Sequence, residues 1–145
     1  MGNLAILIII AVIGGVAVTL QAQMTGLMNQ SLGTLESVFI TYTGGGVLIA
    51  FLLLALRGGN LAAWQSVPWY ALSAGALGLV IIGTISYSVP RLGLVAAFTI
   101  LVATQFITGA VLDHFGLLGA AVRPFDLARL VGVGALLAGA WLIIR

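Results

Sequence analysis

The feature that most constrains this chain is a succession of five apolar runs, each long enough to cross a lipid bilayer. At about 1.5 Å per residue, a helix of about 20 residues spans the roughly 30 Å of hydrocarbon in a membrane. Backbone polar groups in hydrocarbon must pair within their own segment, so such runs fold as helices. The sequence therefore predicts an all-α integral membrane protein, a single membrane domain over residues 1–145, with five transmembrane helices at about residues 4–28, 37–56, 69–87, 92–118 and 125–144.

The composition supports this class and excludes others. Hydrophobic residues make up 62% of the chain and charged residues 6%, with a mean hydropathy of +1.28, whereas about 25% of the residues in a soluble domain carry charge. The chain has one histidine and no cysteine, so we expect no enzyme activity, no metal site and no cofactor. The five basic residues are arginines scattered singly between apolar runs, and we expect no nucleic-acid binding.

Polar side chains at the C-terminal end of the first run cost free energy where they lie within the hydrocarbon. Residues 19–29 read TLQAQMTGLMN, and an amide in hydrocarbon needs a partner or a ligand because no water is present. At 100° per residue, Gln21 and Thr25 fall in one sector of the helix, with Asn29 at its margin. This polar strip either bonds to a neighbouring helix or lines a cavity, and the pattern leaves both roles open.

The fourth run repeats the arrangement, with one amide at mid-depth. Phe98, Gln105 and Gly109 share one helical face, with Asp113 at its edge and His114 next to it. Asp113 and His114 lie close to the end of the run, where ionisable side chains can reach the headgroups. A structural role at the interface and a role in ion or proton coupling are both open.

The arginines give little bias in orientation. Five spans put the termini on opposite sides, so Arg57, Arg123 and Arg129 lie on the side of the N-terminus, and Arg91 and Arg145 lie on the other. An excess of one arginine is too weak to fix orientation by the positive-inside rule. We therefore expect dual topology, in which copies inserted both ways pair into an antiparallel dimer with ten helices.

Several strings along the chain resemble the YdcZ-type family of bacterial inner-membrane proteins, in the drug/metabolite transporter superfamily. These are Gln21 followed by Asn29 and Leu32, the PRLG sequence that begins at Pro90, the mid-helix Gln105, and the DHFG sequence of residues 113–116. The DHFG sequence is the most specific of them. The resemblance implies a multi-pass protein of the bacterial inner membrane with five helices per chain, paired with itself or with a homologous chain.

The superfamily also implies a distant likeness to the small multidrug resistance transporters, with one departure. Those proteins carry a glutamate in the first helix, which binds protons and cationic substrate in competition. The nearest polar positions here are Gln21 and Gln23, which do not titrate. Coupling, if present, must use Asp113, His114 or Glu36, or an ion held by amides and carbonyls.

We expect a secondary transporter of a small organic molecule, with its site at the midplane of the antiparallel dimer and membrane lipid around it. The expected substrate contacts are Gln21, Thr25, Asn29, Phe98 and Gln105. A small dual-topology ion channel would use similar amide-lined and threonine-lined surfaces, and a non-transporting membrane subunit is the third class that the sequence allows.

Overall fold

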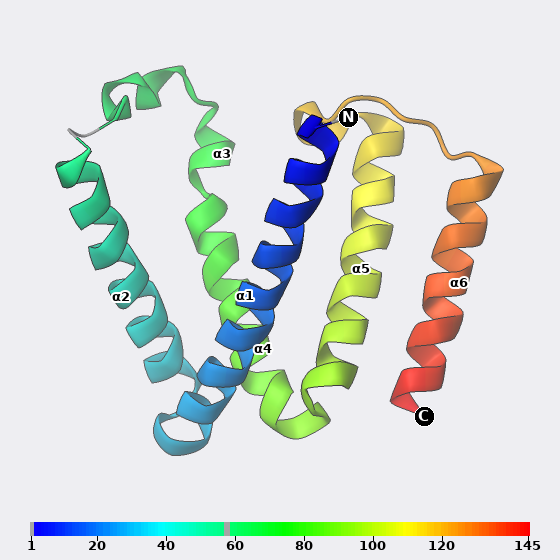
Figure 1. The fold of residues 1–145 in the computed structure, drawn as a ribbon, viewed down its shortest axis with the longest axis horizontal. Coiled ribbons are helices and arrows are strands. Elements are labelled where there is room, and N and C mark those ends of the chain that lie inside the picture. Colours follow the sequence, from blue (N-terminus) through cyan, green and yellow to red (C-terminus); the bar gives the residue numbers. More distant parts are fainter. Residues whose placement is uncertain (1, 57–58) are drawn as a thin grey trace. The chain divides into compact units, whose positions relative to one another are not determined.

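The computed structural model describes residues 2–56 and 59–145, with the backbone alone for residues 2, 3 and 129. Arg57 and the Arg129 side chain, both used in the orientation argument, lie outside this description. In chain order the elements are α1 (Gly2–Leu32), α2 (Thr34–Ala55), the 3₁₀ helix η1 (Leu61–Ser66), α3 (Trp69–Leu72), α4 (Ala74–Leu92), α5 (Leu94–Phe115), the 3₁₀ helix η2 (Leu117–Gly119) and α6 (Leu127–Ile144). The described residues contain no strand, and the predicted all-α fold is confirmed (Figure 1).

The chain divides into two compact units, Met1–Arg91 and Leu92–Arg145. In the first unit α1 and α2 diverge from a sharp junction at Gly33 (Figure 1). Gly33 has a φ of 104°, a conformation that glycine adopts readily and other residues avoid. The Asn29 amide bridges the junction by donating to the Thr34 hydroxyl at 2.6 Å. The Glu36 carboxylate lies beside Gly33, where it complements the positive end of the α2 dipole.

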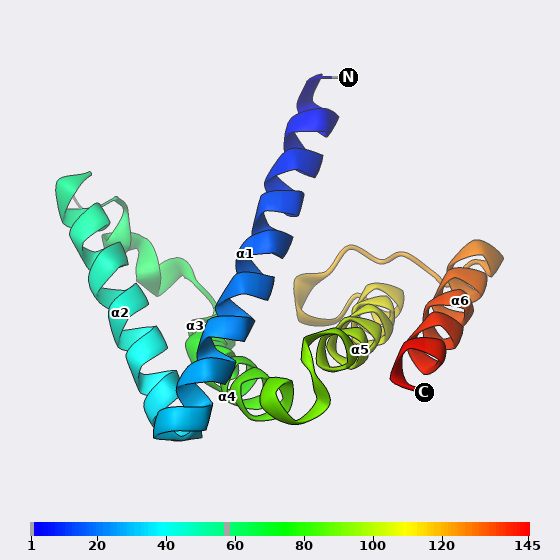
Figure 2. The ribbon, with the colours of Figure 1, turned by 60° about the horizontal axis from the view of Figure 1, so that its bottom comes forward.

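In the first unit, the C-terminal half of α1 packs against α4, and the two helices run side by side there (Figures 1 and 2). A Cβ added at Gly26 would lie only 3.2 Å from a methyl carbon of Val89. Next to this contact, the buried Ser86 hydroxyl donates to the backbone carbonyl of Thr25 at 3.2 Å. Small residues allow this close approach, as is usual between helices in membranes.

The expected third span is divided and longer than predicted. A turn at Ser73 separates α3 from α4, and α4 continues through Pro90 to Leu92, beyond the predicted end at Tyr87. Proline removes one backbone N–H from the helix. Arg91 supplies a donor in the same turn, because its guanidinium bonds to the Tyr87 carbonyl at 2.6 Å.

The other helix boundaries also differ from the predicted ones. Helix α1 extends past residue 28 to Leu32, and α2 begins at Thr34, because the only break between them is the single residue Gly33. Helix α5 ends at Phe115, before the predicted residue 118. The triple glycine at residues 44–46 lies inside α2, and no described atom lies within 4 Å of an added Cβ there, so no described residue packs closely against it.

The second unit is a helical pair. Helix α6 runs antiparallel to α5 beside it, and a loop over residues 120–126 joins η2 to α6 (Figures 1 and 2). Gly116 follows the last residue of α5 and has a left-handed φ of 62°, and this turn starts the connection.

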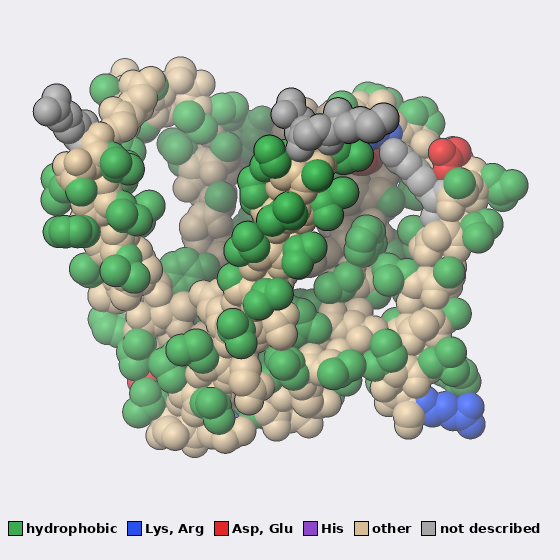
Figure 3. Space-filling view, in the orientation of Figure 1, with side chains coloured by type: hydrophobic (Ala, Val, Ile, Leu, Met, Phe, Trp, Pro, Cys, Tyr) green, Lys and Arg blue, Asp and Glu red, His purple; other side chains and the backbone are tan. Residues whose placement is uncertain are grey.

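Four helical segments in the described residues are long and apolar enough to cross a membrane: Leu4–Leu32, Thr34–Ala55, Trp69–Leu92 and Leu94–Phe115. The segment Leu130–Ile144 is apolar but shorter. Hydrophobic side chains are spread over the visible surface of the helices, with few charged side chains among them (Figure 3). Such a surface suits hydrocarbon as its solvent, because a soluble protein rarely exposes large continuous apolar patches.

Candidate functional site

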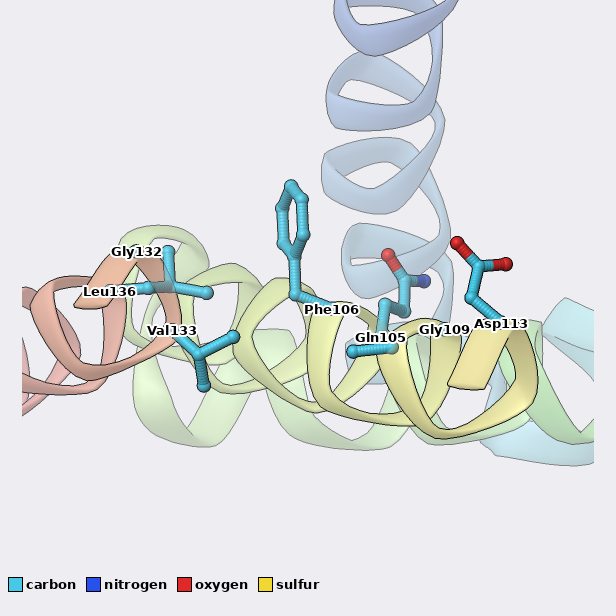
Figure 4. Close-up of a pocket in the computed structure, with 8 residues that line it drawn as sticks. Gln105, Phe106, Gly109, Asp113, Gly132, Val133 and Leu136 are labelled. Atoms are coloured by element: carbon cyan, nitrogen blue, oxygen red, sulfur yellow. The ribbon is translucent and has the colours of Figure 1, made fainter. Parts of the chain in front are cut away.

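One face of α5 carries the polar groups of the candidate site. Gln105, Gly109 and Asp113 follow one another at intervals of four residues, which places them on one side of a helix. Figure 4 shows the Gln105 amide and the Asp113 carboxylate projecting to the same side of α5. Gly109 lies between them and leaves the backbone open, so the two polar groups border one continuous space.

Helix α6 forms the opposite wall of this space. Together the two helices enclose a groove of about 650 Å³, within the range typical of small-molecule sites. It is lined by Gln105, Phe106, Gly109, Ala110, Asp113, Gly132, Val133 and Leu136. The lining is mostly apolar with two polar groups, the composition expected of a site that orients an organic ligand.

The side chains of the two polar residues in the groove have no described partner. Within the part of the chain that the structure describes, no hydrogen bond or ion pair joins the Gln105 amide or the Asp113 carboxylate to another residue. Gln105 is exposed and Asp113 is half-buried. Both groups are therefore open to a ligand from the groove.

The DHFG sequence forms the turn that closes one end of the helical pair. The Asp113 backbone carbonyl accepts the Arg123 N–H at 2.8 Å, and the His114 Nδ1 accepts the Phe125 N–H at 3.1 Å. The rings of His114 and Phe125 also lie against each other, with centroids 5.0 Å apart. An Nδ1 that accepts a hydrogen bond has no proton, so His114 is the neutral Nε2–H tautomer in this arrangement.

The sequence left two roles open for His114, a structural one at the interface and one in ion or proton coupling, and the coupling role stays a prediction. Its Nδ1 holds the loop in place, while Asp113 faces the groove beside it. Among the described residues, no group of three or more histidine, aspartate or glutamate side chains lies close enough to hold a metal ion.

The predicted polar strip of α1 divides into three environments. Thr25 is buried with an exposed fraction of 1%, and its hydroxyl donates to the Ala22 carbonyl at 3.0 Å. Asn29 bonds to Thr34 at the junction with α2. Gln21 is exposed. Thr25 and Asn29 therefore have hydrogen-bond partners inside the chain, whereas the Gln21 amide points outward.

Phe98 was also expected at the site. It is half-buried on α5 and does not line the groove, while Phe106, two turns further on, does. Sequence reasoning missed Phe106 and the α6 wall of Gly132, Val133 and Leu136. The last run is rich in small residues, which suit helix packing, but they give no signal for which of its faces meets α5.

These features define a class: a multi-pass helical membrane protein with a lipid-compatible surface and a polar-ended groove between two helices. The chain belongs to the YdcZ family, because residues 6–142 match the family described as "Putative inner membrane exporter, YdcZ". Searches of curated proteins and of solved structures gave no match.

The family match confirms the resemblance that the DHFG sequence and the other strings predicted. Together with the four apolar helices, it makes the protein a multi-pass transporter-type protein of the inner membrane. The family is described as an exporter, which is not an enzyme class.

Proposed function

We propose that the protein is a secondary transporter that exports a small organic molecule, which it binds near the bilayer midplane in an antiparallel pair of chains. The family description names an exporter without naming a substrate. The observation that carries the proposal is the groove between α5 and α6, with two polar groups on one wall that bond to no described residue.

The depth of Gln105 supports a transport site over a structural role. It lies near the middle of the 22-residue helix α5, which puts its amide near the centre of the hydrocarbon. An amide there costs free energy unless it is hydrogen-bonded. Because no described residue bonds to it, a substrate in the groove is the natural partner.

The antiparallel pair requires α6 to cross the membrane. Its 18 residues reach about 27 Å at 1.5 Å per residue, close to the roughly 30 Å of the hydrocarbon. With α6 as the fifth crossing the termini lie on opposite sides, and two oppositely inserted chains form the inverted repeats on which many secondary transporters are built. In such a pair, the exposed Gln21 of each copy is the second amide assigned to the shared site.

A matched pair of glycine substitutions on α6 tests the groove. Gly132 lines the groove, whereas Gly134 does not, and an added Cβ at either position meets no described atom within 4 Å. In proteoliposomes screened with small metabolites, the wild-type chain should catalyse saturable flux of at least one of them. Gly132→Leu should reduce that flux at least tenfold, because the side chain fills the groove, and Gly134→Leu should leave it unchanged.

Both variants must keep the wild-type helical circular dichroism and elution volume for this comparison to hold. A correctly folded Gly132→Leu protein with wild-type flux would rule out the groove as the substrate site.

A further inference from the structure

We infer that the groove binds an amphipathic organic cation, with its charged group on the Asp113 carboxylate and a hydrogen-bonding group at its other end on the Gln105 amide. This inference rests on the proposed function and adds the substrate class. It follows from the charge, the spacing and the depth of the lining residues.

The charge of the lining favours a cation. Asp113 is the one ionisable residue among the described residues that line the groove, and no described cationic side chain pairs with it. The neighbouring His114 turns its Nδ1 to the Phe125 N–H at 3.1 Å. Because no described cationic side chain neutralises it, this carboxylate attracts a positive ligand and repels an anion, so the groove discriminates by charge.

The spacing sets the shape of the ligand. Gln105 and Asp113 are eight residues apart on one face of α5, which corresponds to about 12 Å along the helix axis. Between these polar ends the walls are apolar or small, with Phe106, Val133 and Leu136 as the large members. A complementary molecule has an apolar middle and a polar group at each end, and only one of those groups is charged.

The depth of the two ends fits such a ligand in a membrane. Asp113 lies two residues before the end of α5 at Phe115, close to the headgroups, where a charge costs far less than at the bilayer centre. Gln105 lies near the centre, where an uncharged amide is the less costly polar group. The ligand therefore keeps its charge near the interface and its neutral end at the midplane.

A matched pair of probes separates charge from shape. Octane-1,8-diamine with one acetyl group has an ammonium and an amide at opposite ends of an eight-carbon chain, which matches the span of about 12 Å between the two polar residues. The doubly acetylated molecule has the same length without the charge. Binding of both is measured by titration calorimetry on wild-type protein, Asp113→Asn and Gln105→Leu in lipid nanodiscs.

Wild-type protein should bind the cationic probe at least tenfold more tightly than the neutral one. Asp113→Asn should weaken binding of the cationic probe by about tenfold to a hundredfold, as expected for a charge-assisted hydrogen bond, and leave the neutral probe unchanged. Gln105→Leu should weaken both probes by a similar factor.

Equal binding of the two probes, no binding of the cationic probe, or an unchanged affinity in folded Asp113→Asn protein would overturn the inference. The flux comparison of Gly132→Leu with Gly134→Leu distinguishes this failure from failure of the proposed function. If Gly132→Leu still blocks flux while the charge effect is absent, the groove remains a transport site for a substrate of another class.

Discussion

Gly26 is the residue on which the packing of α1 against α4 depends. Gly26 is buried, and an added Cβ would lie 3.2 Å from a methyl carbon of Val89, closer than most real contacts, and 3.5 Å from Pro90, an ordinary contact distance. A larger side chain must push the two helices apart. That movement would also stretch the neighbouring hydrogen bond from Ser86 to the Thr25 carbonyl, which is 3.2 Å long.

Gly26→Leu should therefore lower the free energy of unfolding by about 1–3 kcal/mol, the usual cost of overpacking. Gly15→Leu on the same helix is the control, because no described atom lies within 4 Å of a Cβ there and leucine is the better helix former. Unfolding in mixed micelles with increasing SDS measures both. Equal stability of the two variants would show that the contact at Gly26 contributes nothing.

His114 contributes to the turn in two separable ways, through Nδ1 and through its ring. His114→Phe keeps an aromatic ring against Phe125 but removes the acceptor of its N–H. His114→Asn removes the ring but places an amide oxygen where Nδ1 lies. If the hydrogen bond holds the loop, residues 120–126 should exchange amide hydrogens about 2 to 10 times faster in His114→Phe, because a hydrogen bond contributes about 0.5–1.5 kcal/mol.

The same segment in His114→Asn should exchange at close to the wild-type rate. Hydrogen exchange with mass spectrometry at a fixed pH measures both variants. The opposite order, with faster exchange in His114→Asn, would assign the role to ring packing in place of the hydrogen bond.

At the scale of elements, two glycines that follow the end of α5 provide a matched pair of substitutions. Gly116 and Gly119 both have positive φ, 62° and 85°, so alanine costs about 1–2 kcal/mol at either position. Only at Gly116 would the new methyl also collide with the Val122 side chain, 2.7 Å away.

Gly116→Ala should therefore be more destabilising than Gly119→Ala. Because Val122 must move, we expect a difference of about 1 kcal/mol or more in the free energy of unfolding. Val122→Ala should remove most of that difference, since it deletes the colliding methyl groups. A difference that persists in the Val122→Ala background would show that the backbone at Gly116, and not this contact, limits the end of α5.

The sequence predicted the helical elements well because the bilayer sets their length. Runs of apolar residues had to become helices, and four of them have the length and composition of spans. Helix ends were less predictable. A proline usually marks the end of a helix, yet α4 continues through Pro90 to Leu92, because a proline in the last turn removes only one backbone N–H.

The candidate site was only half predictable. Gln105 and Asp113 stood out because polar groups in an apolar helix are costly, and both line the groove. Gly132 and Leu136 did not stand out, since glycine and leucine occur throughout the last helix and carry no polar signal. Which residues of α6 meet α5 depends on the rotation of one helix against another, and helical periodicity in an apolar sequence does not determine it.

For the whole molecule, the decisive question is whether both orientations are needed for export. One side of the membrane has an excess of only one arginine. A small change in loop charge can therefore set the orientation, because positive charge in short loops controls insertion. Two lysines added on one side should therefore commit the chain to a single orientation. Gln30 and Ser31 lie on one predicted side, and Asn60 and Ala121 on the other; all four are exposed.

The double variant Gln30→Lys with Ser31→Lys, and the double variant Asn60→Lys with Ala121→Lys, should each insert one way and each lose export almost completely. Co-expression of the two should restore it, since an antiparallel pair can then form from oppositely inserted chains. Reporter tags on both termini give the orientation, and flux in vesicles gives the activity. Full activity of either variant alone, with its tags on fixed sides, would exclude an antiparallel pair as the working unit.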